Sequence, residues 1–285
     1  MKEYPRILTI QDISCVGQCS LTVALPILSS CGIETCVLPS AVLSTHTGGF
    51  KGFTFRDLTD DMPGIADHWV KEGIKFDAIY TGYLGSPRQV AIVKDIMDRT
   101  LVPGGLKIVD PAMADGGKLY PGFDEKHVES MKELCAYADI VLPNITEACF
   151  LTDTEYRGEG QDRDYVELLI KRLADLGKGT VVLKGILDKP DAMGNAVFDP
   201  AEGNSSYYYT KLISKKSHGP GDCYASAFTG ALLRGAGVNR AAEIAADYVV
   251  KSIELTMDDS DHWYGVKFER AIPWLEEQIK GINGN

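Results

Sequence analysis

The chain has 285 residues, of which 45% are hydrophobic and 24% charged, and its net charge is −11. The acidic balance argues against a nucleic-acid partner, because contacts to phosphate backbones need clustered Lys and Arg. The first residues lack the apolar core of a signal peptide, no run approaches the ~18 apolar residues of a membrane span, and the seven cysteines form no Cys-x-x-Cys pair. We therefore expect a cytoplasmic protein with reduced cysteines and no zinc site.

Strands and helices alternate through the first two thirds of the sequence. The expected strands are Arg6 to Gln11, Glu34 to Leu38, Ala78 to Thr81, Leu106 to Val109, Ile140 to Leu142 and Thr180 to Lys184. The expected helices are Leu21 to Ser30, Pro87 to Arg99, Lys126 to Ala136 and Val166 to Leu176. The strands are nearly all apolar, as is typical of strands buried on both faces. The alternation predicts right-handed crossovers and a mainly parallel sheet with helices on both sides.

The last third of the sequence has a different pattern. Ala196 to Asp199 and Ser206 to Leu212 are expected to pair as antiparallel strands. Helices are expected over Asp222 to Arg234 and Ala241 to Leu255, and Phe268 to Lys280 closes the chain. No linker, low-complexity tract or internal repeat divides the sequence. We therefore predict a single α/β domain over residues 1–285.

Polar side chains recur where the predicted parallel strands end. Ligands of open parallel sheets bind beyond the carboxyl ends of the strands. Each residue alone could instead end a strand or cap a helix, but their recurrence at one edge indicates a binding site. These residues are Asp12 and Ser14, Tyr83, Asp110 and Asp115, Asn144 and Glu147, and Lys184.

The turn Gly219-Pro220-Gly221-Asp222 precedes a helix of small residues. Glycines let the backbone approach a ligand closely, and the unpaired N–H groups of a helix start favour an anion. Pro220 lacks an N–H, so the amides of Gly221, Asp222 and Cys223 remain for a transferring phosphoryl group. Asp222 could take the proton of an attacking hydroxyl, or it could only complement the helix dipole. No Walker-type or protein-kinase signature is present.

Six motifs in order span nearly the whole chain. They are Ile10-Gln11-Asp12-Ile13-Ser14 with Val16-Gly17, Ser44-Thr45-His46-Thr47-Gly48-Gly49-Phe50, Thr81-Gly82-Tyr83-Leu84-Gly85-Ser86, Val109-Asp110-Pro111-Ala112-Met113 with Asp115, Leu142-Pro143-Asn144-Ile145-Thr146-Glu147-Ala148, and the Gly219 turn. Together they resemble the pyridoxal/pyridoxamine kinases of the ribokinase-like superfamily. This resemblance implies a three-layer α/β/α sandwich, a homodimer, and ATP-dependent phosphorylation of the 5′-hydroxymethyl group of pyridoxal, pyridoxamine or pyridoxine.

The resemblance also implies residue roles. Gly219, Gly221 and Asp222 would form the catalytic turn. Substrate binding would fall to Ser14, which would hydrogen-bond the pyridine ring, and to His46, Thr47 and Tyr83. ATP binding would fall to Asp110, Asn144, Lys184 and, by a looser match, Tyr120. Asp115 and Glu147 would hold Mg²⁺, which prefers oxygen ligands and keeps several waters.

Some of these side chains have ordinary structural alternatives. His46 could be a core residue, Tyr83 could simply cover the sheet edge, and Lys184 could be a solvated surface residue. Catalysis should also require a loop that closes over ATP. The candidates for that loop are Gly116 to Gly122 and Leu212 to Ser217.

The sequence also departs from the family pattern. Pro220 replaces a common Thr, and Ala114 stands where Gly is usual. Leu142 replaces a Thr that can contribute to a monovalent cation site, so a potassium requirement is in doubt. Gln18-Cys19 differs from the usual residues of the first loop, which indicates altered substrate contacts there.

Three other functions are weighed against a vitamin B6 kinase. Hydroxymethylpyrimidine kinases usually carry Gln where His46 stands. Sugar kinases carry a Gly-Gly motif and a lid sheet early in the chain, and neither is evident here. A non-catalytic protein that binds vitamin B6 or a nucleotide would have no need to retain both Asp222 and Glu147.

Overall fold

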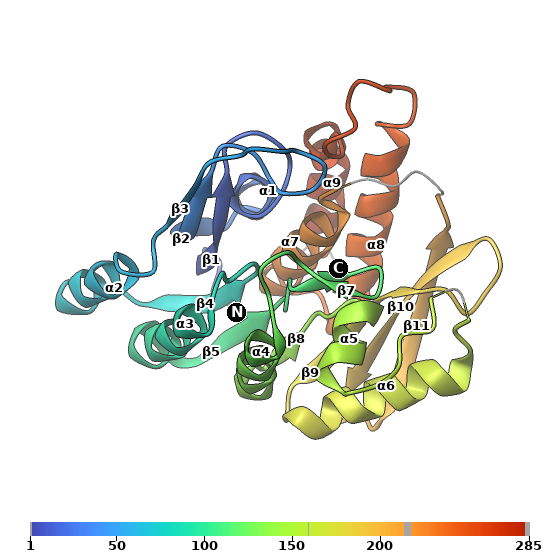
Figure 1. The fold of residues 1–285 in the computed structure, drawn as a ribbon, viewed down its shortest axis with the longest axis horizontal. Helices are drawn as coiled ribbons and strands as arrows, with labels where there is room; N and C mark the ends of the chain where they lie inside the picture. The colour runs from blue at the N-terminus through green and yellow to red at the C-terminus, as the bar shows by residue number, and fades with distance from the viewer. Residues whose placement is uncertain (1, 159, 214–217, 283–285) are drawn as a thin grey trace.

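A nine-stranded sheet forms the centre of the computed structural model, which describes residues 2–158, 160–213 and 218–282 (Figure 1). The strand order is β11-β10-β9-β8-β5-β4-β1-β2-β3. The strands are β1 (Arg6–Ser14), β2 (Glu34–Leu43), β3 (Phe55–Asp57), β4 (Phe76–Thr81), β5 (Leu101–Val109), β8 (Ile140–Val141), β9 (Thr180–Ile186), β10 (Ala192–Asp199) and β11 (Asn204–Lys211). The six strands from β9 to β2 in this order pair in parallel, whereas β3, β10 and β11 run antiparallel to their neighbours.

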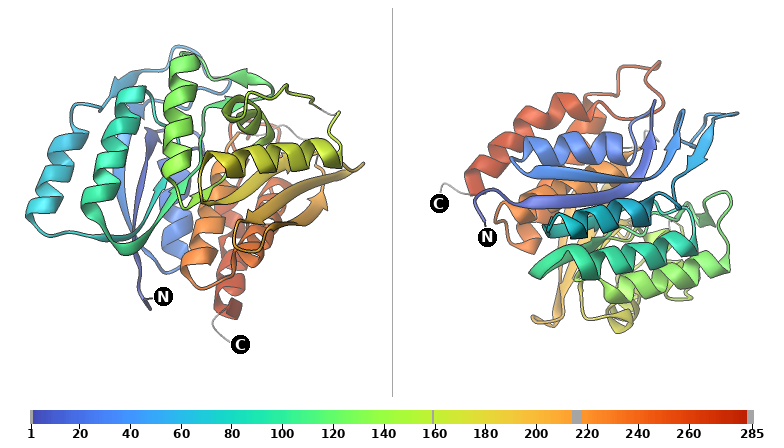
Figure 2. Two further views of the ribbon diagram at one scale, coloured as in Figure 1. Left: turned by 90° about the horizontal axis from the view of Figure 1, so that it is seen from below. Right: turned by 90° about the vertical axis from the view of Figure 1, so that its left-hand side faces the viewer.

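Helices cover both faces of the sheet, so the molecule has three layers (Figure 2). One face is covered by α1 (Leu21–Ser30), α7 (Pro220–Leu233), α8 (Val238–Glu254), a 3₁₀ helix (Phe268–Ala271) and α9 (Ile272–Ile282). The other is covered by α2 (Met62–Lys71), α3 (Pro87–Thr100), α4 (Glu125–Tyr137), α5 (Ile145–Leu151) and α6 (Arg163–Leu176). The predicted α/β/α sandwich with a mainly parallel sheet is confirmed.

Alternation along β1 divides the core in two. Ile7 packs in the cluster beneath α1 and α7, whereas Leu8 and Ile10 pack in the cluster on the opposite face. All three side chains are fully buried, as expected for a central parallel strand. Burial of one such side chain contributes about 1.5–3 kcal/mol to folding.

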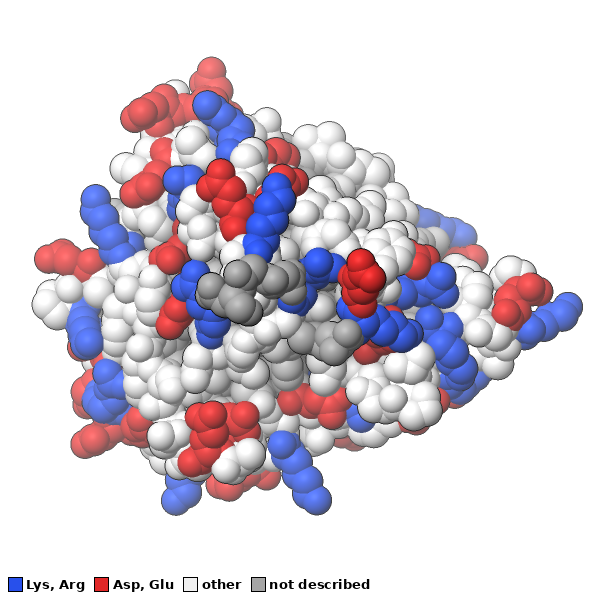
Figure 3. Space-filling view, turned by 180° about the vertical axis from the view of Figure 1, so that it is seen from behind, with Lys and Arg blue, Asp and Glu red and all other residues white. Residues whose placement is uncertain are grey.

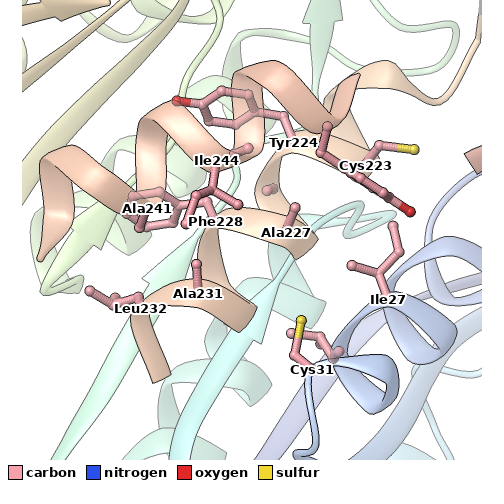
Figure 4. Packing of buried hydrophobic residues seen from close by; sticks show 14 of the residues in the cluster. Ile27, Cys31, Cys223, Tyr224, Ala227, Phe228, Ala231, Leu232, Ala241 and Ile244 are labelled. Carbon is pink, nitrogen blue, oxygen red and sulfur yellow. The ribbon is translucent and has the colours of Figure 1, made fainter. Parts of the chain in front are cut away.

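Small residues allow α7 to pack closely against its neighbours (Figure 4). A methyl group at Gly230 would lie 2.5 Å from Sγ of Cys31, and Ala227 and Ala231 are fully buried. The larger Phe228 is also completely buried in the same cluster. This packing fixes the position of the helix, and with it the position of its first turn at the sheet edge.

Several helices and strands were not predicted from the sequence. They are β3, α2, α5 and a small hairpin of β6 (Ala114–Asp115) with β7 (Lys118–Leu119). The α5 helix has only seven residues, too few to show a helical period, and α2 carries Pro and Gly in its first turn. In addition, β1 and β2 extend to Ser14 and Leu43, beyond their predicted ends.

The surface charge is dispersed on the face shown in Figure 3, where acidic and basic side chains alternate without forming one large patch. None of the helices in the described ranges combines the length and the apolar composition that a membrane span requires.

Candidate active site

The carboxyl ends of the parallel strands and the first turn of α7 meet at one edge of the sheet. Asp222 lies close enough to Asp110, Asp12 and Lys184 for their charges to affect its pKa. Asp110 and Lys184 in turn influence Glu147. Five of the charged residues singled out in the sequence therefore form one cluster.

Asp222 stands in the first turn of α7. Burial raises the pKa of its carboxyl group to about 7, and the nearby carboxylates of Asp110 and Asp12 add to the rise. The backbone N–H of Ser20 donates to Oδ2 of Asp222 at 3.0 Å and acts in the opposite direction. A carboxylate with a pKa near neutrality is well matched to general-base chemistry.

The Gly219 turn has the geometry that its sequence predicts. Gly219 has φ of +86°, and a Cβ there would lie 2.0 Å from the carbonyl oxygen of Gln18, so only glycine fits. Pro220 is the first helical residue, where a missing N–H costs nothing. Gly221 is exposed and has open space around it.

One predicted donor at this turn is wrong. The N–H of Cys223 donates to the carbonyl oxygen of Gly219 at 3.0 Å, because it already belongs to the helical hydrogen-bond ladder. The amides of Gly221 and Asp222 have no acceptor among the described residues. The predicted anion site at this helix start would thus have two donors rather than three.

Lys184 and Asp110 form a buried ion pair. The ammonium nitrogen lies 2.8 Å from Oδ2 of Asp110, and the residues are 9% and 4% exposed. Burial raises the pKa of Asp110, and the charge of Lys184 opposes that rise. The alternative that Lys184 is a solvated surface residue is therefore wrong.

Asn144 and Glu147 form a capping box at the start of α5. The side chain of Asn144 accepts from the N–H of Glu147 and donates to the carbonyl oxygen of Ala114 at 2.9 Å. The two carboxylate oxygens of Glu147 accept from the N–H groups of Asn144 and Met113, at 2.8 and 3.2 Å. Burial, followed by the charge of Asp110, raises the pKa of Glu147 to about 8.

Asp115 differs from the clustered carboxylates in its exposure to solvent. It is exposed on the β6–β7 hairpin, and its Oδ1 accepts from the N–H of Gly116 at 2.8 Å. Within residues 2–158, 160–213 and 218–282, no three His, Cys, Asp or Glu side chains are grouped as ready-made metal ligands. Asp115 and Glu147, the predicted metal pair, are thus a surface residue and a buried helix cap.

Tyr120 follows the same hairpin. Burial raises the pKa of its hydroxyl, and so do the charges of Glu147, Asp222, Asp115 and Asp110, which places the phenol near the carboxylate cluster. The N–H of Tyr120 donates to the carbonyl oxygen of Met113 at 2.8 Å. The predicted loop Gly116 to Gly122 thus borders the cluster, whereas residues 214–217 of the second predicted loop lie outside the described residues.

The predicted substrate residues differ in their surroundings. Ser14 is buried, and its hydroxyl donates to Oδ2 of Asp12 at 2.9 Å. Thr47 is exposed. Tyr83 is half-buried and stacks on Phe123 with ring centroids 5.4 Å apart, and burial raises its pKa to about 12.

His46 has protein partners on both ring nitrogens. Nδ1 accepts from the N–H of Gly48 at 3.0 Å, so Nε2 carries the proton and donates to the carbonyl oxygen of Tyr264 at 2.7 Å. Burial lowers the pKa of His46, which favours the neutral ring. A hydrogen bond from His46 to a ligand would have to replace one of these contacts.

The loop between α8 and the 3₁₀ helix also borders the site, although it was not among the segments predicted to do so. Trp263 packs on Phe50 with ring centroids 4.7 Å apart, and Tyr264 supplies the acceptor for His46. The run His262-Trp263-Tyr264 between two predicted helices was the available signal. Ser20 was not predicted either, because it acts through its backbone N–H, which every residue except proline has.

Comparison with known proteins identifies the family. The family model described as phosphomethylpyrimidine kinase matches residues 34–265. The chain belongs to this family. Among curated relatives, pyridoxal kinase PdxY of Rubrobacter xylanophilus is 28% identical over 264 residues, which cover 88% of this chain and 87% of the relative. The hydroxymethylpyrimidine/phosphomethylpyrimidine kinase of Mycobacterium tuberculosis is also 28% identical, over 255 residues that cover 87% and 88%.

A solved relative has the same fold. A Bacteroides thetaiotaomicron protein assigned as a phosphomethylpyrimidine kinase, crystallised with pyridoxal, superposes with a TM-score of 0.90 at 35% identity. The match covers 95% of this chain and 96% of the relative. The chain is therefore a kinase of the family that acts on vitamin B6 or thiamin precursors, with a ribokinase-like fold.

Proposed function

We propose that the protein is a pyridoxal kinase, which transfers the γ-phosphoryl group of MgATP to the 5′-hydroxymethyl group of pyridoxal, pyridoxamine or pyridoxine. The main support for this proposal is the position of Asp222. Its carboxyl group has a pKa of about 7 and lies beside the backbone N–H groups of the first turn of α7. His46, which stands where pyrimidine kinases usually carry Gln, supports a B6 vitamer. So does the pyridoxal in the crystals of the relative at 35% identity.

In this reaction Asp222 accepts the proton of the substrate hydroxyl. The alkoxide oxygen forms a bond to the γ-phosphorus, the bond from that phosphorus to the β–γ bridging oxygen breaks, and ADP leaves. The amides of Gly221 and Asp222 donate to the oxygens on which negative charge is concentrated. Lys184 adds a positive charge on the nucleotide side while its partner Asp110 holds it in place.

The donor chemistry of the site fits Mg²⁺. Asp110 and Glu147 are buried carboxyl groups with raised pKa values; Lys184 is paired with Asp110, and its charge also acts on Glu147. A divalent ion would offset their negative charge, and Mg²⁺ suits carboxylates that hold it through water. When bound with ATP, the ion supplies charge neutralisation at the phosphates. Asp115, on the exposed β6–β7 hairpin, would reach the ion from the solvent side.

A coupled assay of ADP formation with each vitamer and with hydroxymethylpyrimidine tests the substrate. We expect turnover with at least one B6 vitamer, and turnover with the pyrimidine alone would overturn the proposal. The pyrimidine is the second candidate because the family model and the mycobacterial relative bear that activity in their names.

Replacement of the base tests the mechanism. Asp222→Asn should reduce kcat at least 100-fold, in the range expected when a general base is lost, and leave ATP binding measurable. Asp175→Asn, on the exposed face of α6, is the matched control and should keep wild-type turnover. Wild-type turnover in Asp222→Asn would refute the base assignment. We propose in addition that the protein is a cytoplasmic homodimer. Light scattering of the purified protein tests the oligomeric state.

A further inference from the structure

The loop that joins β1 to α1, residues 15–20, contacts the catalytic turn through its backbone. The carbonyl oxygen of Gln18 lies against Gly219, so closely that a side chain at Gly219 has no room. Two residues further on, the N–H of Ser20 donates to the carboxylate of Asp222 at 3.0 Å. One short segment therefore touches both the turn and the base.

Ser20 adopts an uncommon backbone conformation to make this contact. Its φ of 55° with ψ of −129° lies where glycine is usual and other residues are rare. Such strain persists only when the surrounding structure holds it, and it concentrates at functional sites. The contacts that hold this loop therefore matter for the geometry of Asp222.

The side chain of Gln18 provides such a contact, and it reaches the far end of the sequence. Its Nε2 donates to both carboxylate oxygens of Glu269, at 2.8 and 2.9 Å. Its Oε1 lies 2.7 Å from Nε2 of His262. Because a carboxylate only accepts, the amide nitrogen must face Glu269, and His262 must then donate to Oε1.

Close packing supports the same arrangement. A Cβ at Gly265 would lie 2.4 Å from Oε1 of Gln18, so glycine makes room for the amide between His262 and Glu269. Gln18 is half-buried and Glu269 exposed, and neither belongs to the two hydrophobic clusters. The start of α1 has its own anchor, since Oγ1 of Thr22 donates to the carbonyl oxygen of Cys19 at 2.8 Å. The fold thus does not depend on the Gln18 amide. Because backbone hydrogen bonds to the end of β2 already hold residues 15 and 16, the amide anchors the second half of the loop, next to Gly219.

We propose that Gln18 is a positioning residue for phosphoryl transfer. Its amide ties the β1–α1 loop to His262 and Glu269, and the loop then holds Gly219 and orients Asp222 through Ser20. This inference rests on the proposed function of the Asp222 site, but it does not depend on which alcohol is phosphorylated.

The variant Gln18→Glu tests the proposal with almost no change of shape. It replaces the donor with a carboxylate that faces Glu269, so the two groups repel each other. We expect kcat to fall about tenfold, the loss expected from a small misplacement of catalytic groups, with KM for ATP within about twofold. In the wild type the Ser20 N–H lowers the pKa of Asp222. When the loop moves in the variant, this hydrogen bond weakens and the pKa of Asp222 rises, so the acidic limb of the pH–rate profile should move to higher pH.

The double variant Gln18→Glu/Glu269→Gln is the rescue. It exchanges the amide and the carboxylate between positions 18 and 269. The amide at position 269 can then donate to the carboxylate at position 18, which also still accepts from His262. We expect kcat to return to within about threefold of the wild type. Gln278→Glu on α9, where the side chain accepts from Arg240 at 3.0 Å, is the control for an added charge near the C-terminus and should behave as wild type.

Hydrogen–deuterium exchange gives a second reading that needs no substrate. Peptides covering residues 15–20 and 219–223 should exchange faster in Gln18→Glu and recover in the double variant. Unchanged kcat and exchange in Gln18→Glu would overturn the proposal, as would a double variant as slow as the single one. A wild type that phosphorylates only a pyrimidine, or nothing, refutes the proposed substrate or reaction, whereas the exchange comparison still decides the role of Gln18.

Discussion

The ammonium group of Lys184 lies 2.8 Å from Oδ2 of Asp110, and both side chains are almost completely removed from solvent. A buried charge is tolerated when it has a partner, so the removal of one member leaves the other uncompensated. At the same time the pair stands at the strand ends beside Asp222, where the phosphates of ATP would bind. This arrangement links the stability of the site to its charge.

The first prediction concerns this pair. Lys184→Met should lower the free energy of unfolding by about 3–5 kcal/mol and abolish turnover, because Asp110 is left buried and unpaired. Urea denaturation of the ligand-free protein measures the stability. The double variant Lys184→Met/Asp110→Asn removes both charges and should recover most of that stability without recovering turnover. A single variant as stable as the wild type would contradict the prediction.

The second prediction is a pH dependence. Asp222 must be ionised to act as a base, and its pKa is raised to about 7, so kcat/KM should fall about tenfold for each pH unit below 7. The raised pKa also means that the folded protein binds more protons than the unfolded chain between pH ~4 and ~7. The Asp222 contribution to stability is therefore present at low pH and is lost as the pH rises through about 7.

A comparison of variants isolates this contribution from other titrating groups. Buried histidines such as His127, whose pKa is lowered to about 4, change stability in the opposite direction below pH 6.5. Asp222→Asn should therefore be about 1–3 kcal/mol more stable than the wild type at pH 8 and equally stable at pH 4. Urea denaturation at both values tests the sign, and an equal difference at both would show that Asp222 titrates normally.

The sequence predicted which charged side chains come together better than it predicted their contacts. The carboxyl ends of parallel strands meet at one edge, so Asp12, Asp110 and Lys184 could be expected at the same edge from their positions at the ends of predicted strands. The partner of His46 is a carbonyl oxygen 218 positions away, and Gln18 reaches Glu269 over 251 positions. Such contacts depend on how the C-terminal loop packs, which no local pattern encodes.

The third prediction separates the two glycines of the catalytic turn. Gly219→Ala places a methyl group 2.0 Å from the carbonyl oxygen of Gln18 at a φ of +86°, so we expect loss of stability and turnover. Gly221→Ala has open space around it and should fold with a Tm at or above that of the wild type. Its kcat should nevertheless fall, because the methyl group would stand where we propose that the phosphoryl group approaches. Thermal unfolding with kinetics of both variants is the test, and equal behaviour of the two would contradict it.

The last prediction concerns Glu147. Its two oxygens accept from the N–H groups of Asn144 and Met113, whereas a glutamine has one oxygen and would turn its amide donors toward the other N–H. Glu147→Gln should therefore cost about 1–3 kcal/mol of stability. If the carboxylate also holds Mg²⁺ through water, as we propose, the Mg²⁺ concentration for half-maximal rate should rise.

Glu125→Gln is the matched control for that variant, because Glu125 also stands in the first turn of a helix but is exposed. It should leave both quantities unchanged. A loss of stability in Glu147→Gln without a change in Mg²⁺ dependence would assign Glu147 to the capping box alone. Because the carboxylate of Glu147 is already satisfied by two backbone donors, its contact with the ion must run through water or through a lone pair that those donors leave free. Titration with Mg²⁺ at fixed ATP therefore distinguishes a structural acid from one that serves both roles.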